Sequence, residues 1–181
     1  MKRLLRLVIA FWGVATFLWA GGLSLESPDL SDRLSLEQVY DGYRCGGKNI
    51  SPELLWHGEP KGTKSFAVTM FDPDAPTGHG WWHWIVVNIP VHLHTLPKGA
   101  GDPSGKRLPA GAVQTLNDFR KPGYGGACPP KGDAPHRYIV TVYALDVEKL
   151  PVTSDTSPAR AVALIEKHAI AKASLTSRYG R

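Results

Sequence analysis

One short segment of the sequence gathers groups that could bind a charged ligand. Asp72 and Asp74 flank Pro73 in Asp-Pro-Asp-Ala-Pro (72–76), and Gly-His-Gly-Trp-Trp-His-Trp follows at residues 78–84. The prolines restrict the backbone, so the two carboxylates are held at low entropic cost. In an isolated turn such acids cap nearby backbone N–H groups, but here His83 begins an apolar run that is typical of a strand. We therefore expect a site at this strand edge.

The chemistry that these residues favour is anion binding. Asp72 in the loop can accept an N–H from His83 on the neighbouring strand, which favours the imidazolium and raises the pKa of the histidine. The other ring nitrogen of His83 would then face the anion. Gly123, Gly125 and Gly126 in a second loop allow the main chain to approach closely, and their N–H groups could form an anion-binding concavity.

The elements that must position these groups are strands. Residues 65–71 contain β-formers with partial alternation, and residues 84–89 form a nearly continuous apolar run, as expected for a strand buried on both faces. Residues 136–145 alternate clearly and place His136 and Tyr138 on one face, which adds an imidazole and a phenol donor to the site.

Helix is expected only near the end of the sequence. Ser157 is a good N-cap residue, Pro158 fits the first helical position, and the apolar stripe of Val162 and Ile165 reaches Ala169. We expect this helix to continue or restart over residues 170–180. Strands joined by long loops, with late helix, predict a mainly β fold: an antiparallel or mixed β-sandwich with a peripheral C-terminal helix.

The chain of 181 residues fits a single domain behind a leader. Basic residues at positions 2, 3 and 6 precede an apolar run of about 13 residues, shorter than the roughly 20 that span a bilayer, and then Ala-Gly-Gly at 20–22. We expect residues 1–22 to be a signal peptide and residues 23–181 to be one domain. The protein would be periplasmic or secreted after cleavage.

Charge and cysteine content narrow the partners. Without the three leader cations the formal charge of +5 falls to +2, with no basic cluster interleaved with aromatics, so nucleic acid is not an expected partner. Cys45 and Cys128 could form one disulfide in an oxidising compartment or could remain two unpaired thiols. Their spacing does not resemble a zinc or redox motif.

The motifs together resemble the two signature regions of the phosphatidylethanolamine-binding protein family, also called Raf-kinase-inhibitor-like proteins. The matching segments are Asp-Pro-Asp-Ala-Pro at 72–76, Trp-x-His at 81–83, Pro-Pro-x-Gly at 129–132 and His-Arg-Tyr at 136–138. Residues 124–130, Tyr-Gly-Gly-Ala-Cys-Pro-Pro, resemble the bacterial branch. The similarity runs from about residue 25 to the C-terminus.

The resemblance implies a β-sandwich with a small pocket that binds phosphate or a phosphorylated or phospholipid head group without a metal or cofactor. It implies a binding protein and not an enzyme, one that could modulate a partner protein as kinase-inhibitor-like proteins do and that could form a homodimer. Carried over to this sequence, the ligand-binding residues are Asp72, Trp81, His83, Pro129, His136 and Tyr138.

Two other functions remain open at this point. A secreted inhibitor of a protease or of a host protein would leave no signature in the sequence. A metal-dependent hydrolase could use Asp72, His83 and His136 as acid, base or ligands, although no Gly-x-Ser-x-Gly elbow or His-Glu-x-x-His helix accompanies them.

Overall fold

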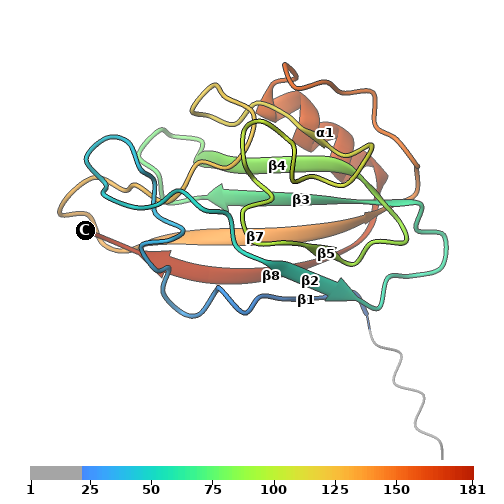
Figure 1. Ribbon diagram of the computed structural model, residues 1–181, viewed down its shortest axis with the longest axis horizontal. Helices are drawn as coiled ribbons and strands as arrows, with labels where there is room; N and C mark the ends of the chain where they lie inside the picture. The colour runs from blue at the N-terminus through green and yellow to red at the C-terminus, as the bar shows by residue number, and fades with distance from the viewer. Residues whose placement is uncertain (1–21) are drawn as a thin grey trace, which may run out of the picture.

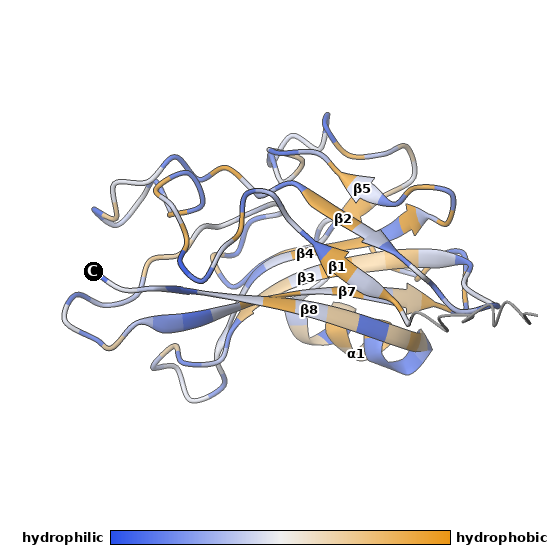
Figure 2. Cartoon of the chain, turned by 90° about the horizontal axis from the view of Figure 1, so that it is seen from below, coloured by the Kyte–Doolittle hydropathy of each residue, from blue (hydrophilic) through white to orange (hydrophobic). Residues whose placement is uncertain are grey.

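Two antiparallel sheets and one helix form three layers in the computed structural model, which describes residues 22–181 (Figures 1 and 2). The larger sheet has the order β6-β4-β3-β7-β8, and the smaller has the order β1-β2-β5. In chain order the elements are β1 (Ser24–Glu26), β2 (Leu54–His57), β3 (Ser65–Asp72), β4 (Trp81–Pro90), β5 (Thr95–Leu96), β6 (Val113–Gln114), β7 (His136–Leu145), α1 (Pro158–His168) and β8 (Ala169–Tyr179).

The three central strands are buried because both faces of the large sheet are covered. Figure 2 shows the small sheet on one side of it and α1 on the other. On β4, Trp84 belongs to the core between the two sheets, where Trp56 and Phe66 pack edge to face with ring centroids 5.4 Å apart. The next residue, Ile85, packs in the second core, under Ile165 of the helix. This double coverage confirms the prediction that the apolar run at 84–89 is a strand buried on both faces. It also confirms the predicted β-sandwich with a C-terminal helix.

The prediction for the last residues was wrong. The helix ends at His168, and residues 169–179 form β8, which pairs antiparallel with β7 from Leu145↔Ala169 to His136↔Tyr179. Small residues on β8, such as Ala173, face the inter-sheet core, and the residues between them are exposed. This alternation has the period of a strand, but side chains as short as alanine give it only a weak signal in the sequence. Pairing with a long, well-formed neighbour decides the conformation here.

The expected leader, residues 1–22, lies almost wholly outside the described residues and stays a prediction, as does the single domain over 23–181. In the part of the chain that the structure describes, no helix is long and apolar enough to cross a bilayer.

The antiparallel order brings the candidate residues to one end of the large sheet. Strand β3 ends at Asp72, β4 begins at Trp81, which pairs with Asp72, and β7 begins at His136 on the other side of β3. These ends lie where the C-terminus does in Figure 1, among the long loops.

Candidate functional site

A pocket of about 200 Å³ opens at this end of the sheet. Strands β3, β4 and β7 supply its floor, and the loops before β2, between β3 and β4 and between β6 and β7 supply its walls. All six residues that the sequence singled out line it: Asp72, Trp81, His83, Pro129, His136 and Tyr138. Seven others line it as well: Tyr43, Ala75, Pro76, Thr77, Phe119, Cys128 and Pro130. Among residues 22–181, no group of three or more His, Cys, Asp or Glu side chains is arranged to hold a metal ion.

Asp72 is bonded to a different histidine from the expected one. Its Oδ2 accepts a hydrogen bond from Nδ1 of His136 at 2.8 Å, and its Oδ1 accepts the backbone N–H of Asp74 at 2.8 Å. Nε2 of His136 lies 3.4 Å from a carboxylate oxygen of Asp133, so this imidazole lies between two acids. Because β3 has β4 on one side and β7 on the other, Asp72 could reach either neighbour, and its carboxylate bonds to β7 instead of to His83.

His83 is held by the backbone. Its Nδ1 lies 2.6 Å from the carbonyl oxygen of Gly125, so Nδ1 carries a proton and donates it, while Nε2 is left for the pocket. The side chain is nearly completely buried, and this burial lowers the pKa of His83, with the Gly125 hydrogen bond and the negative charge of Asp72 opposing the effect. The predicted rise in pKa was therefore wrong in direction, because Asp72 acts on His83 only through space while desolvation acts fully.

Two buried donors in the pocket wall lack a well-formed hydrogen bond. The indole Nε1 of Trp81 and the hydroxyl of Tyr138 are both buried, and within residues 22–181 neither makes a hydrogen bond of good geometry, although the hydroxyl lies near the Asp72 carboxylate and the backbone N–H of Cys128. Burial, and then the negative charge of Asp72, raise the pKa of Tyr138 far above its usual value, so the phenol stays protonated. An unpaired buried donor costs about 1–3 kcal/mol, so an acceptor in the pocket would be stabilised by both groups. Gln38 Nε2 and Trp56 Nε1 are also buried without a partner, but neither residue lines the pocket.

The glycine loop does not provide the expected anion-binding concavity. The N–H of Gly125 donates to the carbonyl of His83 at 2.9 Å, and the N–H of Gly126 donates to Oδ1 of Asn49 at 2.7 Å. These glycines instead allow close packing: a Cβ on Gly126 would overlap the backbone of residues 38–40. Their contribution to the pocket is to bring the Gly125 carbonyl to His83.

Aromatic residues at the mouth were missed by the sequence analysis. Phe119 stacks on Tyr40 with ring centroids 4.5 Å apart and meets Trp81 edge-on at 5.4 Å. Tyr43 stacks beside Phe119 at 6.3 Å and is 73% exposed. Isolated aromatic residues in turn-rich loops show no periodicity that would identify them. The signal that could have found them is a large aromatic side chain in a loop, where no hydrophobic core is expected to bury it.

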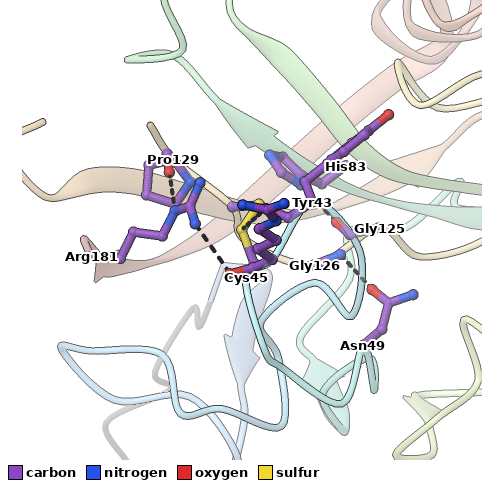
Figure 3. The surroundings of a disulfide bond; sticks show 10 residues. Tyr43, Cys45, Asn49, His83, Gly125, Gly126, Pro129 and Arg181 are labelled. Atoms are coloured by element: carbon purple, nitrogen blue, oxygen red, sulfur yellow. Dashed lines mark hydrogen bonds between the residues drawn. A yellow bond between two sulfur atoms is a disulfide. The ribbon is translucent and has the colours of Figure 1, made fainter. Parts of the chain in front are cut away.

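A disulfide joins the two walls of the pocket, which resolves the alternatives that the sequence left open. Cys45 and Cys128 are bonded, with their Cα atoms 5.7 Å apart. Figure 3 shows the crosslink beside Pro129, whose carbonyl accepts Nε–H of Arg181 at 2.6 Å. Cys128 and Pro129 line the pocket, so the crosslink is part of its wall.

Asp74 fixes the loop after β3 to the start of β7. Its Oδ2 accepts both the backbone N–H and Nε–H of Arg137, at 2.8 and 2.9 Å, and its Oδ1 accepts an Nη2–H at 2.6 Å. The Arg137 side-chain hydrogen bonds lower the pKa of Asp74 to about 2. This arrangement holds Ala75 and Pro76 at the pocket.

We expect the contact between Asp74 and Arg137 to stabilise the fold at pH values above the ordinary pKa range of a carboxyl group. This stabilisation should be lost in acid. A carboxyl whose pKa is lower in the folded than in the unfolded chain stabilises the fold at high pH, and the contribution is lost as the pH falls through the folded value, here about 2. Urea unfolding of Asp74→Asn should show a small loss at neutral pH that shrinks toward about pH 2. Asp155→Asn, at an exposed position, is the control; an equal pH dependence in both variants would contradict the assignment.

A family profile described as phosphatidylethanolamine-binding protein matches residues 26–180. The chain belongs to that family. The YbcL protein of Escherichia coli K12 is 53% identical over 148 residues, which is 82% of this chain and 81% of YbcL. The YbhB protein of the same strain is 49% identical over 160 residues, 87% of this chain and 99% of YbhB.

Solved structures of this family share the fold. The crystal structure of Escherichia coli YbcL, described as a new member of the mammalian family, superposes with a TM-score of 0.87 at 49% identity, covering 89% of this chain and 99% of that one. A homologue from Chlamydia trachomatis, described as a putative phosphatidylethanolamine-binding protein, superposes with a TM-score of 0.69 at 31% identity, covering 88% of this chain and 98% of that one.

Proposed function

We propose that the pocket binds a phosphate-type anion, free or as the head group of a phosphorylated molecule or phospholipid, and that the protein acts as an exported binding protein. The observation that carries this proposal is the pair of unpartnered donors, Trp81 Nε1 and Tyr138 O–H, in the wall of a pocket of about 200 Å³. Phosphate oxygens are acceptors that would complete both hydrogen bonds. Export is supported by the disulfide and by the composition of the first 22 residues.

The proposed anion binding depends on protons, because His83 and Asp72 both line the pocket. Protonated His83 would donate from Nε2 to the anion, but burial disfavours that proton in the empty pocket. A phosphate that keeps one proton could in addition donate it to Asp72, which sulfate cannot do. Binding should therefore take up a proton, and phosphate should bind more tightly than sulfate.

Calorimetric titration with phosphate between about pH 5 and about pH 8 tests this function. Because the anion raises the pKa of His83 in the complex, affinity should increase as the pH falls, by up to about tenfold per pH unit, the limit for one proton. His83→Ala should remove most of the pH dependence, whereas His92→Ala, at an exposed position outside the pocket, should not. Equal affinity for phosphate in all three proteins would overturn the proposal.

The unpartnered hydroxyl gives a prediction in which stability and binding change in opposite directions. Tyr138→Phe removes a buried donor that has no well-formed hydrogen bond within the protein, so we expect the free energy of unfolding to rise by up to about 1 kcal/mol. The same change should weaken phosphate binding about tenfold, because the bound anion loses a donor.

The matched control is Tyr124→Phe. The Tyr124 hydroxyl is also buried, but it donates to the carbonyl of Gln38 at 2.8 Å and lies outside the pocket. Its removal should lower stability and leave phosphate affinity unchanged. Chemical denaturation and titration of both variants measure the two effects. If Tyr138→Phe and Tyr124→Phe lose stability alike, the Tyr138 hydroxyl has a partner and the argument for an anion site fails.

A further inference from the structure

The disulfide connects a strained segment at the mouth of the pocket to its wall. Tyr43 and Arg44 both have positive φ values, 48° and 59°, a conformation that residues other than glycine adopt only at a cost. Two residues in a row in this conformation need contacts that hold them. We call residues 42–46 the rim segment; it carries Tyr43 into the pocket lining.

The base of the rim segment is well anchored by the backbone. Gly47 N–H donates to the Tyr40 carbonyl at 3.0 Å, and Asn49 N–H donates to the Val39 carbonyl at 2.8 Å. Tyr40 N–H in turn donates to Ala127 of the opposite loop at 3.0 Å. These bonds do not involve the cysteines, so the base would persist without the crosslink.

The tip of the rim segment is held differently. The Cys45–Cys128 bond joins it to the pocket wall, and an Arg181 Nη1–H reaches the Arg44 carbonyl at a long 3.3 Å (Figure 3). Within the tip, the Cys45 N–H donates to the Gly42 carbonyl at 2.9 Å and closes a turn around Tyr43 and Arg44. The ring of Tyr43 stacks on Phe119 but is mostly exposed, so it buries little area to hold the segment in place. Removing the crosslink would detach this turn from the pocket wall, so that the tip could move as a unit about its anchored base.

We propose that the Cys45–Cys128 disulfide is a redox latch on the ligand pocket: reduction releases the rim segment and weakens anion binding, while oxidation restores it. The proposal rests on the proposed function, since it concerns the same pocket. Its structural half, release of the rim segment, can be tested without any ligand.

Reduction requires a thiol or dithiol, and re-oxidation requires a disulfide compound that runs the same exchange in reverse. A thiolate attacks one sulfur of the pair and forms a mixed disulfide, and the other cysteine leaves as a thiolate that takes up a proton. A second thiolate then attacks the mixed disulfide, so that two protein thiols and one oxidised reductant result. Cys128 is the sulfur to attack, because it lies in the pocket lining and is partly exposed, whereas Cys45 is buried.

Anion binding and reduction of the disulfide should affect each other in both directions. A ligand that binds the oxidised protein more tightly than the reduced protein must make reduction less favourable by the same factor. An anion in the pocket would also cover the approach to Cys128 and repel an incoming thiolate. Bound phosphate should therefore protect the disulfide.

The test compares the oxidised protein, the same protein reduced by dithiothreitol under native conditions, and the variant Cys45→Ser/Cys128→Ser. We expect reduction and the double substitution to weaken phosphate binding about tenfold and to speed amide hydrogen exchange in residues 42–46, with exchange in β3 and β7 unchanged. Saturating phosphate should slow reduction at least severalfold, whereas chloride at equal ionic strength should not. Unchanged phosphate affinity after reduction, or unchanged exchange in the rim segment, would overturn the latch.

Two further measurements keep the proposal testable if a variant unfolds or phosphate does not bind. Tyr43→Ala keeps the disulfide but removes the rim side chain, and it should weaken phosphate binding as reduction does; Leu36→Ala, at an exposed site outside the pocket, is its control. Wild-type affinity in Tyr43→Ala would count against the latch. If the oxidised protein does not bind phosphate, the proposed function fails, and the latch is then decided by exchange and by the NMR titration of His83, whose pKa should move up toward its ordinary value as water enters.

Discussion

Asp72→Ala is expected to lower the free energy of unfolding by about 3 kcal/mol, because it removes the acceptor of two hydrogen bonds in a buried site. Asp72 and His136 are each at most 4% exposed, and the carboxylate accepts a hydrogen bond from the imidazole and another from the Asp74 backbone. Alanine would leave a buried ring nitrogen and a turn N–H without acceptors. Urea unfolding at neutral pH measures the loss.

A double-mutant cycle separates this pair from the general cost of a cavity. If the Asp72–His136 contact is the main contribution, Asp72→Ala should cost at least about 1.5 kcal/mol less in a His136→Ala background than in the wild type. Asp72→Asn keeps an acceptor of the same shape and should fall between wild type and alanine. Additive losses in the cycle would mean that Asp72 stabilises the fold through its turn and not through His136.

Gly126→Ala is expected to lower the free energy of unfolding by about 3 kcal/mol and to weaken phosphate binding. A Cβ at this position would overlap the carbonyl oxygen of Gln38 and the backbone of Val39 and Tyr40, and backbone atoms cannot rotate out of the way. The loop would have to move, and with it the carbonyl of Gly125 that holds Nδ1 of His83. The substitution should thus disturb the pocket although Gly126 does not line it.

The control is Gly180→Ala, whose added Cβ would lie 3.1–3.4 Å from Pro135, a tight contact that a small shift relieves. We expect a loss of less than about 1 kcal/mol there. Thermal or chemical unfolding gives the stabilities, and the chemical shifts of His83 report whether its hydrogen bond survives. A Gly126→Ala protein with wild-type stability and an unperturbed His83 would show that the two loops are not in close contact.

The central strands were predictable because burial on both faces leaves a mark in the sequence. The apolar run at 84–89 and the alternation at 136–145 correspond to β4 and β7. Strand β8 was not predicted because alanine and serine carry little hydrophobic signal and fit a helix as well as a strand. Its conformation is decided by ten register pairs with β7, a contact that no local pattern contains.

The candidate pocket was likewise predictable only in part. The sequence indicated which residues line it, because chemically unusual side chains gather at strand ends. The partners were wrong, because Asp72 could bond to either flanking strand and only register and side-chain direction choose His136 over His83. The pKa of His83 then followed burial, which a sequence does not measure. Tyr43 and Phe119 were absent from the prediction because they reach the pocket from loops of no regular structure.

The pairing of early and late segments affects how this protein is made. Arg33, near the start of the described residues, bridges to Arg178 near their end, and the backbone N–H of Arg178 donates to Asp32. The last strand borders β7 and therefore completes the large sheet. A ribosome must deliver every residue from Asp32 to Arg178 before these distant partners can meet, and such long-range closure is slow. The nascent chain should remain open and protease-sensitive until β8 has emerged.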